Sequence, residues 1–428
     1  MIPLLLPFVG LLAVGMPVAF VVGISAFAYF HSVPYLNFQV AVQMIFSQSQ
    51  SFPFLAVPFF IFAGNLMNVS GITTRILELA RLLTRTMYGG TAQLSVFMST
   101  LMGGISGSAT ADAAMNTRIL GPDMMRLGYP KGYICALQCV TAMVVATLPP
   151  SLGLIIFGFV GEVSIARLFA AGIVPGFMIA IALMITAGIT TRVRGFEPPA
   201  KDTPRLTFGE LFSNLKTSIW ALLFPVILIV GIRFGVFTPS ESGAFAVLYA
   251  VLIGKFVYKE LTWEKFKGAL GTTLKDNGAI MLIIAMSGPF SFAVTWLQLP
   301  VTLSGFIFGI TENPQGMVLI MLGFLFVVGL FVDSNVNFLL LTPIFLPMVT
   351  AAGIDPVHFG ILMATIATLG VMTPPVGTAL LTVCGIINCP IDEYTKESLP
   401  FMLTIFVVLI ILLFFPNLVL FIPDIIFG

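Results

Sequence analysis

Apolar stretches separated by short polar turns run along nearly the whole chain. An uninterrupted apolar stretch of more than about 18 residues is typical of a transmembrane helix. The pattern therefore predicts an all-α polytopic membrane protein. The predicted crossings lie at residues 2–30, 38–70, 130–161, 165–191, 218–237, 239–258, 277–308, 357–387 and 400–422.

Three segments depart from this simple pattern. Residues 91–126 and 317–352 are apolar but carry polar residues and prolines in their interior, and they do not fit as single crossings. We predict that each enters the membrane and returns on its own side, as a re-entrant helical hairpin. Residues 72–88 place charged and apolar side chains on opposite faces at helical spacing, which predicts an amphipathic helix lying in the membrane interface.

The chain also repeats itself at a displacement of 225 positions. Residues 108–153 align with residues 333–378 without a gap, and the double proline Pro149-Pro150 falls on Pro374-Pro375. A duplicated element with a polar tip and a helix interrupted by proline is typical of secondary transporters.

Composition supports the membrane assignment, because 58% of residues are hydrophobic and only 9% are charged. A soluble domain carries roughly 25% charged residues. The formal net charge of +1 argues against nucleic acid as a partner. We read the four cysteines, at 135, 139, 384 and 389, as small buried hydrophobes; Cys135 and Cys139 would share a helix face, but no histidine or further cysteine nearby in sequence completes a metal site.

The basic residues predict how the chain crosses the bilayer. Thirteen of the 19 fall in segments 75–85, 192–216 and 255–275, which the positive-inside rule places in the cytoplasm. Counting crossings between them gives a cytoplasmic N-terminus and a periplasmic C-terminus. On this path the two hairpins open to opposite sides of the membrane, as an inverted repeat requires.

The first hairpin carries the run GGISGSATAD at 103–112. Glycine permits a sharp turn inside the membrane, but packing does not explain two serines, a threonine and Asp112 at that depth. A carboxylate in a bilayer is costly unless paired or solvated, so Asp112 is a candidate for function. The alternative is that Asp112 caps the second limb by accepting hydrogen bonds from free N–H groups.

The proline pairs interrupt helices in the middle of two predicted crossings. Proline lacks the N–H that would bond the carbonyl four residues earlier, so Pro149 and Pro150 free the carbonyls of Val145 and Ala146. In hydrocarbon such carbonyls need protein donors, water or a bound cation. Beside the hairpin we predict sodium, which prefers several neutral oxygens. The first predicted sodium site comprises Ser106, Gly107, Ser108, Asp112, Val145, Ala146 and Pro149.

The second copy repeats this logic with other side chains. Its hairpin reads DSNVN at 333–337, and its proline pair frees the carbonyls of Gly370 and Val371. The second predicted sodium site comprises Asp333, Asn335, Asn337, Gly370, Val371, Thr373, Pro374 and Gly377.

A helix that restarts after each break points its positive N-terminus into the membrane, near Ser151 and Thr378. An anionic substrate group is stabilised by such an end. The predicted substrate-binding residues are Ser108, Thr110, Ser151, Asn335 and Thr378. The expected activity is thus cation-coupled uptake of an organic anion, with no cofactor other than Na+ as the coupling ion.

Several runs together resemble one family, the large (DctM-like) membrane subunit of the tripartite ATP-independent periplasmic (TRAP) transporters. They span nearly the whole chain in the family's order: FLAVP at 54–58, GSATADAA at 107–114, TPSE at 238–241, LTPIFLP at 341–347, GIDPVHFG at 353–360 and TPPVG at 373–377. Residues 378–381 read TALL where many dicarboxylate members carry Leu-Asn-Leu-Phe, so both a sialic acid and a C4-dicarboxylate stay open as substrates.

This resemblance implies a sodium-driven elevator transporter of the ion transporter superfamily type in the bacterial inner membrane. Its implied partners are a small four-helix (DctQ-like) membrane subunit and a periplasmic substrate-binding (DctP-like) protein. It also implies four units in the chain. In repeat 1, residues 1–90 form scaffold helices and the interfacial arm helix, and residues 91–191 form the transport core, with hairpin 91–126 and broken helix 130–161. Residues 192–316 form a cytoplasmic loop and the scaffold helices of repeat 2. Residues 317–428 form the transport core of repeat 2, with hairpin 317–352, broken helix 357–387 and the last helix.

Three alternatives remain from the sequence: a symporter that needs no binding protein, a sodium or anion channel, and an intramembrane aspartyl protease using Asp112 and Asp333. The protease is disfavoured because Asp112 aligns with Asn337 and Asp333 with Ser108, so the two carboxylates are not repeat equivalents. No HExxH or Gly-x-Ser-x-Gly motif occurs either.

Overall fold

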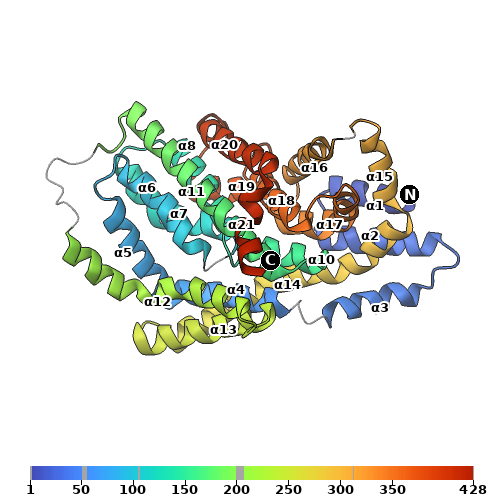
Figure 1. Ribbon diagram of the computed structural model, residues 1–428, viewed down its shortest axis with the longest axis horizontal. Helices are drawn as coiled ribbons and strands as arrows, with labels where there is room; N and C mark the ends of the chain where they lie inside the picture. Colours follow the sequence, from blue (N-terminus) through green and yellow to red (C-terminus); the bar gives the residue numbers. More distant parts are fainter. Residues whose placement is uncertain (1, 51–54, 105–106, 199–206, 312, 428) are drawn as a thin grey trace.

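A computed structural model describes residues 2–50, 55–104, 107–198, 207–311 and 313–427, and these residues form helices and turns without strands (Figure 1). The helices of the first half are α1 (Ile2–Ala13), α2 (Val18–Ser32), α3 (Phe38–Ser49), α4 (Ala56–Val69), α5 (Ile72–Thr84), α6 (Gly90–Gly103), α7 (Ala109–Arg126), α8 (Lys131–Thr141), α9 (Met143–Thr147), α10 (Leu152–Val160) and α11 (Ile165–Arg194). Those of the second half are α12 (Phe208–Arg233), α13 (Pro239–Leu252, followed by a π-helical turn Ile253–Val257), α14 (Trp263–Trp296), α15 (Leu299–Phe308), α16 (Pro314–Gly329), α17 (Ser334–Ala351), α18 (Pro356–Val371), α19 (Thr378–Ile387), α20 (Ile391–Phe414) and α21 (Pro416–Phe427). The predicted all-α architecture is confirmed.

The repeat extends well beyond the stretch that aligns in sequence. Adding 225 to the bounds of α7, 109 and 126, gives 334 and 351, which are the bounds of α17. The same addition carries 131, the first residue of α8, onto 356, the first residue of α18. It also carries 38, where α3 begins, onto 263, where α14 begins. The long helix α14 is therefore the counterpart of α3 and α4 together.

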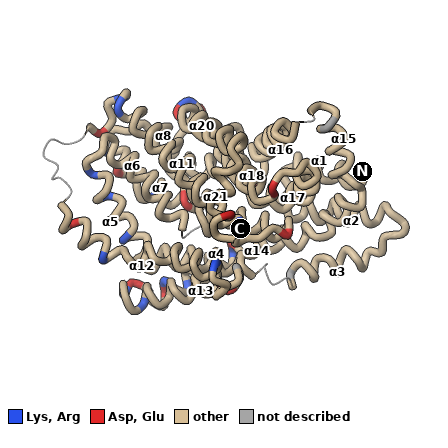
Figure 2. The backbone as a smooth tube through the Cα atoms, in the orientation of Figure 1, with Lys and Arg blue, Asp and Glu red and all other residues tan. Residues whose placement is uncertain are grey.

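Both predicted hairpins are confirmed as pairs of helices, α6–α7 and α16–α17. In Figure 2 most Lys and Arg lie on the side of the molecule that holds α5, α12 and α13, whereas the side around α2, α15 and α17 carries almost none. The hairpin α6–α7 lies toward the basic side and α16–α17 toward the other (Figures 1 and 2). This placement agrees with two repeats of opposite orientation.

Three predicted crossings are interrupted in the structure. The segment 2–30 is two helices, α1 and α2, which pack against each other because the chain turns at Gly15 (φ +81°) and Pro17. The segment 277–308 breaks at Gln298 (φ +50°), between α14 and α15, and α14 begins at residue 263. The segment 38–70 holds the separate helices α3 and α4. The cytoplasmic position of the N-terminus was predicted by counting residues 2–30 as one crossing. Because this segment is two helices, that position stays a prediction.

Length and composition allow six of the described helices to cross a membrane, and eight crossings if two bent pairs each count as one. One bent pair is α4 and α5, at 65°, and α5 is the predicted amphipathic helix. Helix α5 packs on α6 and α12, its residues Ile72, Ile76 and Leu79 are buried, and Arg75 pairs with Glu260 of the second repeat. The helix therefore joins the first hairpin to helices of the second repeat.

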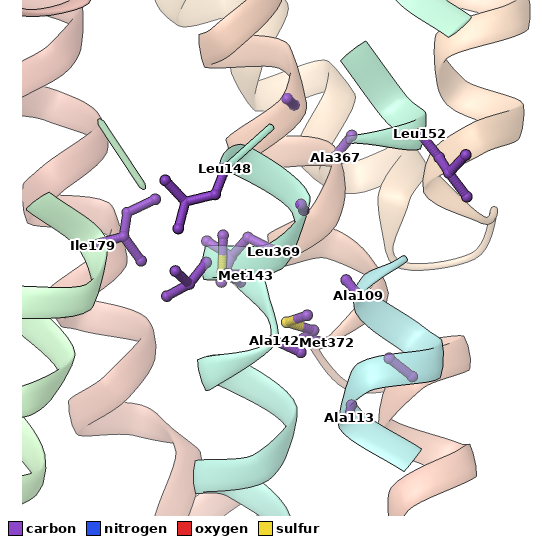
Figure 3. Close-up of a cluster of buried hydrophobic side chains, with 14 of the residues drawn as sticks. Ala109, Ala113, Ala142, Met143, Leu148, Leu152, Ile179, Ala367, Leu369 and Met372 are labelled. Carbon is purple, nitrogen blue, oxygen red and sulfur yellow. The ribbon is translucent and has the colours of Figure 1, made fainter. Parts of the chain in front are cut away.

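The two broken helices form the centre of the molecule. All residues of α18 from Val357 to Val371 are buried, as are those of α8 from Gly132 to Thr141. Helix α10 packs against α17 and α19 packs against α7, so each broken helix contacts the hairpin of the other repeat. Figure 3 shows apolar side chains from α7, α9 and α18 gathered around the first break, with Ala113, Met143 and Leu369 among them.

Candidate functional site

A cavity of about 460 Å³, named the polar cavity for the seven polar residues in its wall, lies where the N-terminal ends of both hairpins' second limbs meet helices α4 and α14. Apolar side chains such as Ile61, Leu152 and Ile280 form part of its wall. Its polar lining residues are Asn65, Asn68, Ser108, Thr110, Asp276, Asn335 and Thr382. Five helices of the two repeats, α4, α7, α14, α17 and α19, thus contribute hydrogen-bonding groups to one space.

Three of the five residues predicted to bind substrate, Ser108, Thr110 and Asn335, line this cavity. Ser151 is not among its described lining residues. Its side chain is fully buried, its hydroxyl donates to the carbonyl of Ala146 at 2.5 Å, and its oxygen accepts from the N–H of Leu154 at 3.4 Å. Ser151 therefore caps α10 and has no hydroxyl donor left to offer a ligand. Thr378 also lies outside the described lining, and its buried Oγ1 has no hydrogen-bond partner among the described residues.

The first predicted sodium site is partly assembled. Ser106 lies outside the described residues. Gly107 (φ +62°) packs so closely on the proline break that a Cβ there would lie 2.6 Å from the carbonyl oxygen of Pro150, and its own carbonyl accepts from the N–H of Leu152 at 3.2 Å. Ser108 caps α7, accepting from the N–H of Ala111 at 3.5 Å. The end of the first hairpin thus docks directly on the break at Pro149.

One carbonyl of this site is not free. The Ala146 oxygen, which Pro150 leaves without its helical donor, accepts the hydroxyl of Ser151, so the expectation that it lacks a hydrogen-bond donor is wrong. A serine two residues after the first proline is close enough to fold back onto the preceding turn. The Val145 carbonyl lies four residues before the other proline, Pro149, which has no N–H to give it.

Asp112 is 1% exposed and does not cap α7, so the capping alternative is wrong. Its Oδ2 accepts from Ser99 Oγ on α6 at 2.7 Å and from Asn116 Nδ2 at 3.0 Å. Its Oδ1 and the Oδ1 of Asn116 are buried without a hydrogen-bond partner among the described residues. No described basic residue pairs with Asp112. Buried acceptor oxygens without donors favour a cation or a proton beside them.

The second predicted sodium site differs in which carbonyls it offers. The Gly370 oxygen accepts from the N–H of Thr373 at 3.0 Å, because the last turn of α18 tightens, so its expected freedom is wrong. At Gly377 (φ +22°) a Cβ would lie 2.8 Å from the Val371 oxygen and 2.9 Å from the Thr373 oxygen. Two carbonyl oxygens therefore converge beside Gly377, next to the unpartnered hydroxyl of Thr378.

The side chains of the second hairpin have distinct places. Asp333 caps α17, with Oδ1 accepting from the N–H of Asn335 at 2.9 Å. Asn337 is buried, with Nδ2 3.5 Å from the Val332 oxygen. Asp112 and Asp333 therefore have unlike surroundings, the first in a hydrogen-bonded interior cluster and the second at a helix N-terminus.

Sequence analysis missed Asn65, Asn68, Asp276 and Thr382. Asn65 Nδ2 donates to Thr273 Oγ1 at 3.0 Å and approaches Asp276 Oδ2 at 3.4 Å, which ties α4 to α14 at the cavity wall. Two asparagines three positions apart on an apolar helix share a face, and that spacing was an available signal. Asp276 was obscured because it directly follows Lys275, in a segment assigned to the cytoplasm by its charge.

Comparison with known proteins agrees with this architecture. Residues 5–418 match the family described as "Tripartite ATP-independent periplasmic transporter, DctM component". The chain is 34% identical over 421 residues to the sialic acid TRAP transporter large permease protein SiaM of Vibrio cholerae, covering 98% of both chains. It is 31% identical over 413 residues to the 2,3-diketo-L-gulonate TRAP transporter large permease protein YiaN of Escherichia coli, covering 96% of both.

The fold also matches the crystal structure of the Alcanivorax borkumensis YdaH transporter. The TM-score is 0.68 at 14% sequence identity, over 97% of this chain and 98% of that one. Because the relatives are transporter permease subunits, the aspartyl protease alternative is excluded. The family match over nearly the full length, together with these identities, shows that the chain belongs to the DctM family, the large membrane permease component of TRAP transporters.

Proposed function

We propose that this chain carries out sodium-coupled uptake of a hydroxylated organic acid. As a TRAP large permease it works with a small permease subunit and a periplasmic substrate-binding protein in the inner membrane. The observation that carries the proposal is the polar cavity that both hairpins and helices α4 and α14 line together. Such a cavity at the meeting point of two repeats is where secondary transporters bind substrate.

The lining chemistry favours a substrate rich in hydroxyl or amide groups. Asn65, Asn68 and Asn335 offer both donors and acceptors, and three hydroxyl side chains add to them. The substrate carboxylate is assigned to the N-terminus of α7, because its cap, Ser108, is neutral and the acid of its first turn, Asp112, is hydrogen-bonded to Ser99 in the interior. The cap of α17 is Asp333, whose negative charge already compensates the positive N-terminus of that helix.

The same lining disfavours a dicarboxylate. Asp276 is the one charged side chain among the described lining residues, and it is negative. A second substrate carboxylate would meet that charge without a basic partner, and two like charges in one site repel each other. The V. cholerae relative is named for sialic acid and the E. coli relative for 2,3-diketo-L-gulonate, and both compounds are hydroxylated acids. The proposal therefore places a hydroxylated monocarboxylate ahead of a C4-dicarboxylate.

Sodium coupling is supported by oxygens without donors near both breaks. The Val371 and Thr373 carbonyls converge beside Gly377, and Thr378 Oγ1 has no described partner. In the first repeat the end of the hairpin lies on the break at Pro149, and Asp112 is buried among neutral side chains. Unwound carbonyls at helix breaks are the ligands that sodium uses in transporters of this architecture.

We also propose movement of the core along the scaffold, as in an elevator. A second cavity, of about 600 Å³, lies farther along α14, beside Ser287, Ser291 and Thr295, and its opposite wall includes Val160 at the end of α10. Helix α14 thus borders one cavity near Asp276 and another about two to three turns onward. A core that shifts along α14 would meet either cavity in turn.

The experiment is uptake into proteoliposomes that contain this chain and its small subunit, with the cognate binding protein outside. Labelled sialic acid and labelled succinate are compared with and without an inward sodium gradient. We expect saturable uptake of sialic acid that needs both sodium and the binding protein, and little uptake of succinate. Uptake without the binding protein would show an ordinary symporter, and uptake that does not saturate would show a channel. Preference for succinate would overturn the assignment of substrate class.

A further inference from the structure

Three cysteine side chains meet at one point between the two repeats. Cys135 lies on α8, Cys384 on α19 and Cys389 in the turn after α19, and their sulfurs all lie within 4.8 Å of one another. All three are buried and none is in a disulfide. The sequence analysis read all four cysteines as small buried hydrophobes and placed Cys135 and Cys139 on one helix face. The structure instead brings Cys135 together with two cysteines about 250 positions away.

The distances between the three sulfurs suit a bound metal ion. A metal–sulfur bond of about 2.3 Å holds three sulfurs about 4.0 Å apart when the ion lies in their plane. Sulfurs within 4.8 Å of one another need to move by less than about 1 Å to reach that geometry. Three thiolates select soft ions such as Cu(I), Zn²⁺ or Cd²⁺ over the hard ions Na⁺ and Mg²⁺.

The backbone around the three sulfurs is held in place. The N–H of Cys389 donates to the carbonyl of Cys384 at 2.9 Å, and Asn388 between them adopts φ +54°, which turns the chain back toward α19. Lys131, at the start of α8, donates to the Asn388 carbonyl at 3.4 Å. Both cysteines of the second repeat are therefore fixed relative to the helix that carries Cys135.

The charges near the cluster also fit a bound ion. As thiols, Cys135 and Cys389 point toward the Val383 and Pro390 carbonyls, at 3.9 and 3.4 Å. Binding replaces each S–H bond by a sulfur–metal bond and releases its proton to solvent. Three thiolates around a divalent ion leave a single negative charge, and the ammonium of Lys131 lies beside the same turn to offset it. On the topology that the basic residues predict, this turn faces the cytoplasm, where thiols stay reduced.

We propose that Cys135, Cys384 and Cys389 form a binding site for a single soft, thiophilic metal ion. The site is separate from the polar cavity and does not depend on the transported substrate. A bound ion ties α8 of the first repeat to the α19–α20 turn of the second, so it stabilises the contact between the two broken helices. Cys139 is the matched control, because it is buried on the same helix but lies outside the cluster.

The test is titration of the purified full chain with Cd²⁺ under reducing conditions, followed by the ultraviolet absorption of cadmium–thiolate bonds. We expect one Cd²⁺ per chain. Loss of a residue that only supports a metal ligand weakens metal binding roughly 10- to 100-fold. Cys135→Ser and Cys384→Ser each remove a ligand, so each should weaken Cd²⁺ binding by more than that. Cys139→Ser should leave it unchanged. No cadmium–thiolate absorption in the wild-type chain, or equal loss in Cys139→Ser, would overturn the proposal.

X-ray absorption of the cadmium-loaded wild-type chain gives an independent answer that needs no variant to fold. Three sulfur neighbours around each ion support the site. One sulfur neighbour or none contradicts it. The wild-type chain should also unfold at a higher temperature with Cd²⁺ present, because an ion that binds only the folded state stabilises it.

Discussion

Ser99 on α6 donates its hydroxyl to Oδ2 of Asp112 on α7 at 2.7 Å, so the two limbs of the first hairpin are joined inside the protein by a neutral group and a carboxylate. The other oxygen of Asp112 has no described hydrogen-bond partner. Two neutral donors, the Ser99 hydroxyl and the Asn116 amide, do not balance the charge of a buried carboxylate. The carboxylate therefore depends on a cation or a proton for its stability.

Asp112→Asn tests whether that cation is sodium. The amide keeps a side chain of the same shape, but it removes the charge. We expect the sodium concentration for half-maximal uptake to rise at least about tenfold, which corresponds to about 1.4 kcal/mol. Ser99→Ala is the matched control, because it keeps the charge while it removes the hydrogen bond to the carboxylate, worth roughly 1.5–3 kcal/mol, and the bond that Ser99 accepts from Asn116. If both variants show the same sodium dependence as the wild type, Asp112 has no part in coupling.

Asp333→Ser separates a structural role from a charged one. Serine is the residue that caps the equivalent helix of the first repeat, at position 108, and it caps about as well as aspartate. We expect the melting temperature to stay close to that of the wild type while sodium-dependent uptake falls. Asp333→Ala should lose both, since removing the cap costs roughly 0.5–2 kcal/mol. Wild-type uptake in Asp333→Ser would show that Asp333 is only a cap.

Asp276→Asn tests the proposed exclusion of dicarboxylates. Removing the negative charge from the cavity wall should let succinate compete better against labelled sialic acid in the uptake assay. We expect the inhibition constant of succinate to fall by several-fold and that of sialic acid to change less. Glu264→Gln, an exposed acid on the same helix, controls for a change in overall charge. Equal selectivity in both variants would contradict the role assigned to Asp276.

Sequence patterns predicted the elements better than the contacts between them. The hairpins and the proline breaks follow from local rules of periodicity and from the missing proline N–H, so both could be placed within a few residues. Which carbonyls stay without a donor could not be predicted. Ser151 donates to the Ala146 oxygen and Thr373 to the Gly370 oxygen through geometry that the sequence does not contain. Contacts between distant helices, such as Asn65 with Asp276 or Cys135 with Cys384, depend on how the two repeats pack.

The interruptions at Gly15 and Gln298 show the same limit at the level of whole helices. Apolar content continues through both turns, so a hydropathy rule joins two helices into one crossing. A glycine followed by a proline at 15–17 was a local signal for the first turn. At Gln298 the positive φ belongs to a residue type that rarely adopts it, and Pro300 two positions later was the only nearby hint.

Gly377→Ala tests the convergence of carbonyl oxygens in the second repeat. At φ +22° an added Cβ would meet the Val371 oxygen at 2.8 Å and the Thr373 oxygen at 2.9 Å, so the backbone must shift. We expect a loss of roughly 1–3 kcal/mol in the free energy of unfolding and a clear loss of sodium-dependent uptake. The measurements are thermal unfolding and the sodium dependence of uptake in proteoliposomes.

The control for this variant lies on the same helix. Gly385 has no atom within 4 Å of an added Cβ, and alanine at a helical position is favoured over glycine by up to about 1 kcal/mol. Gly385→Ala should therefore keep full uptake and unfold at the same or a slightly higher temperature. If Gly377→Ala also keeps the sodium dependence of the wild type, the Val371 and Thr373 carbonyls do not bind the coupling ion. If it loses stability but keeps that dependence, the close approach at Gly377 serves only the packing of the break between α18 and α19.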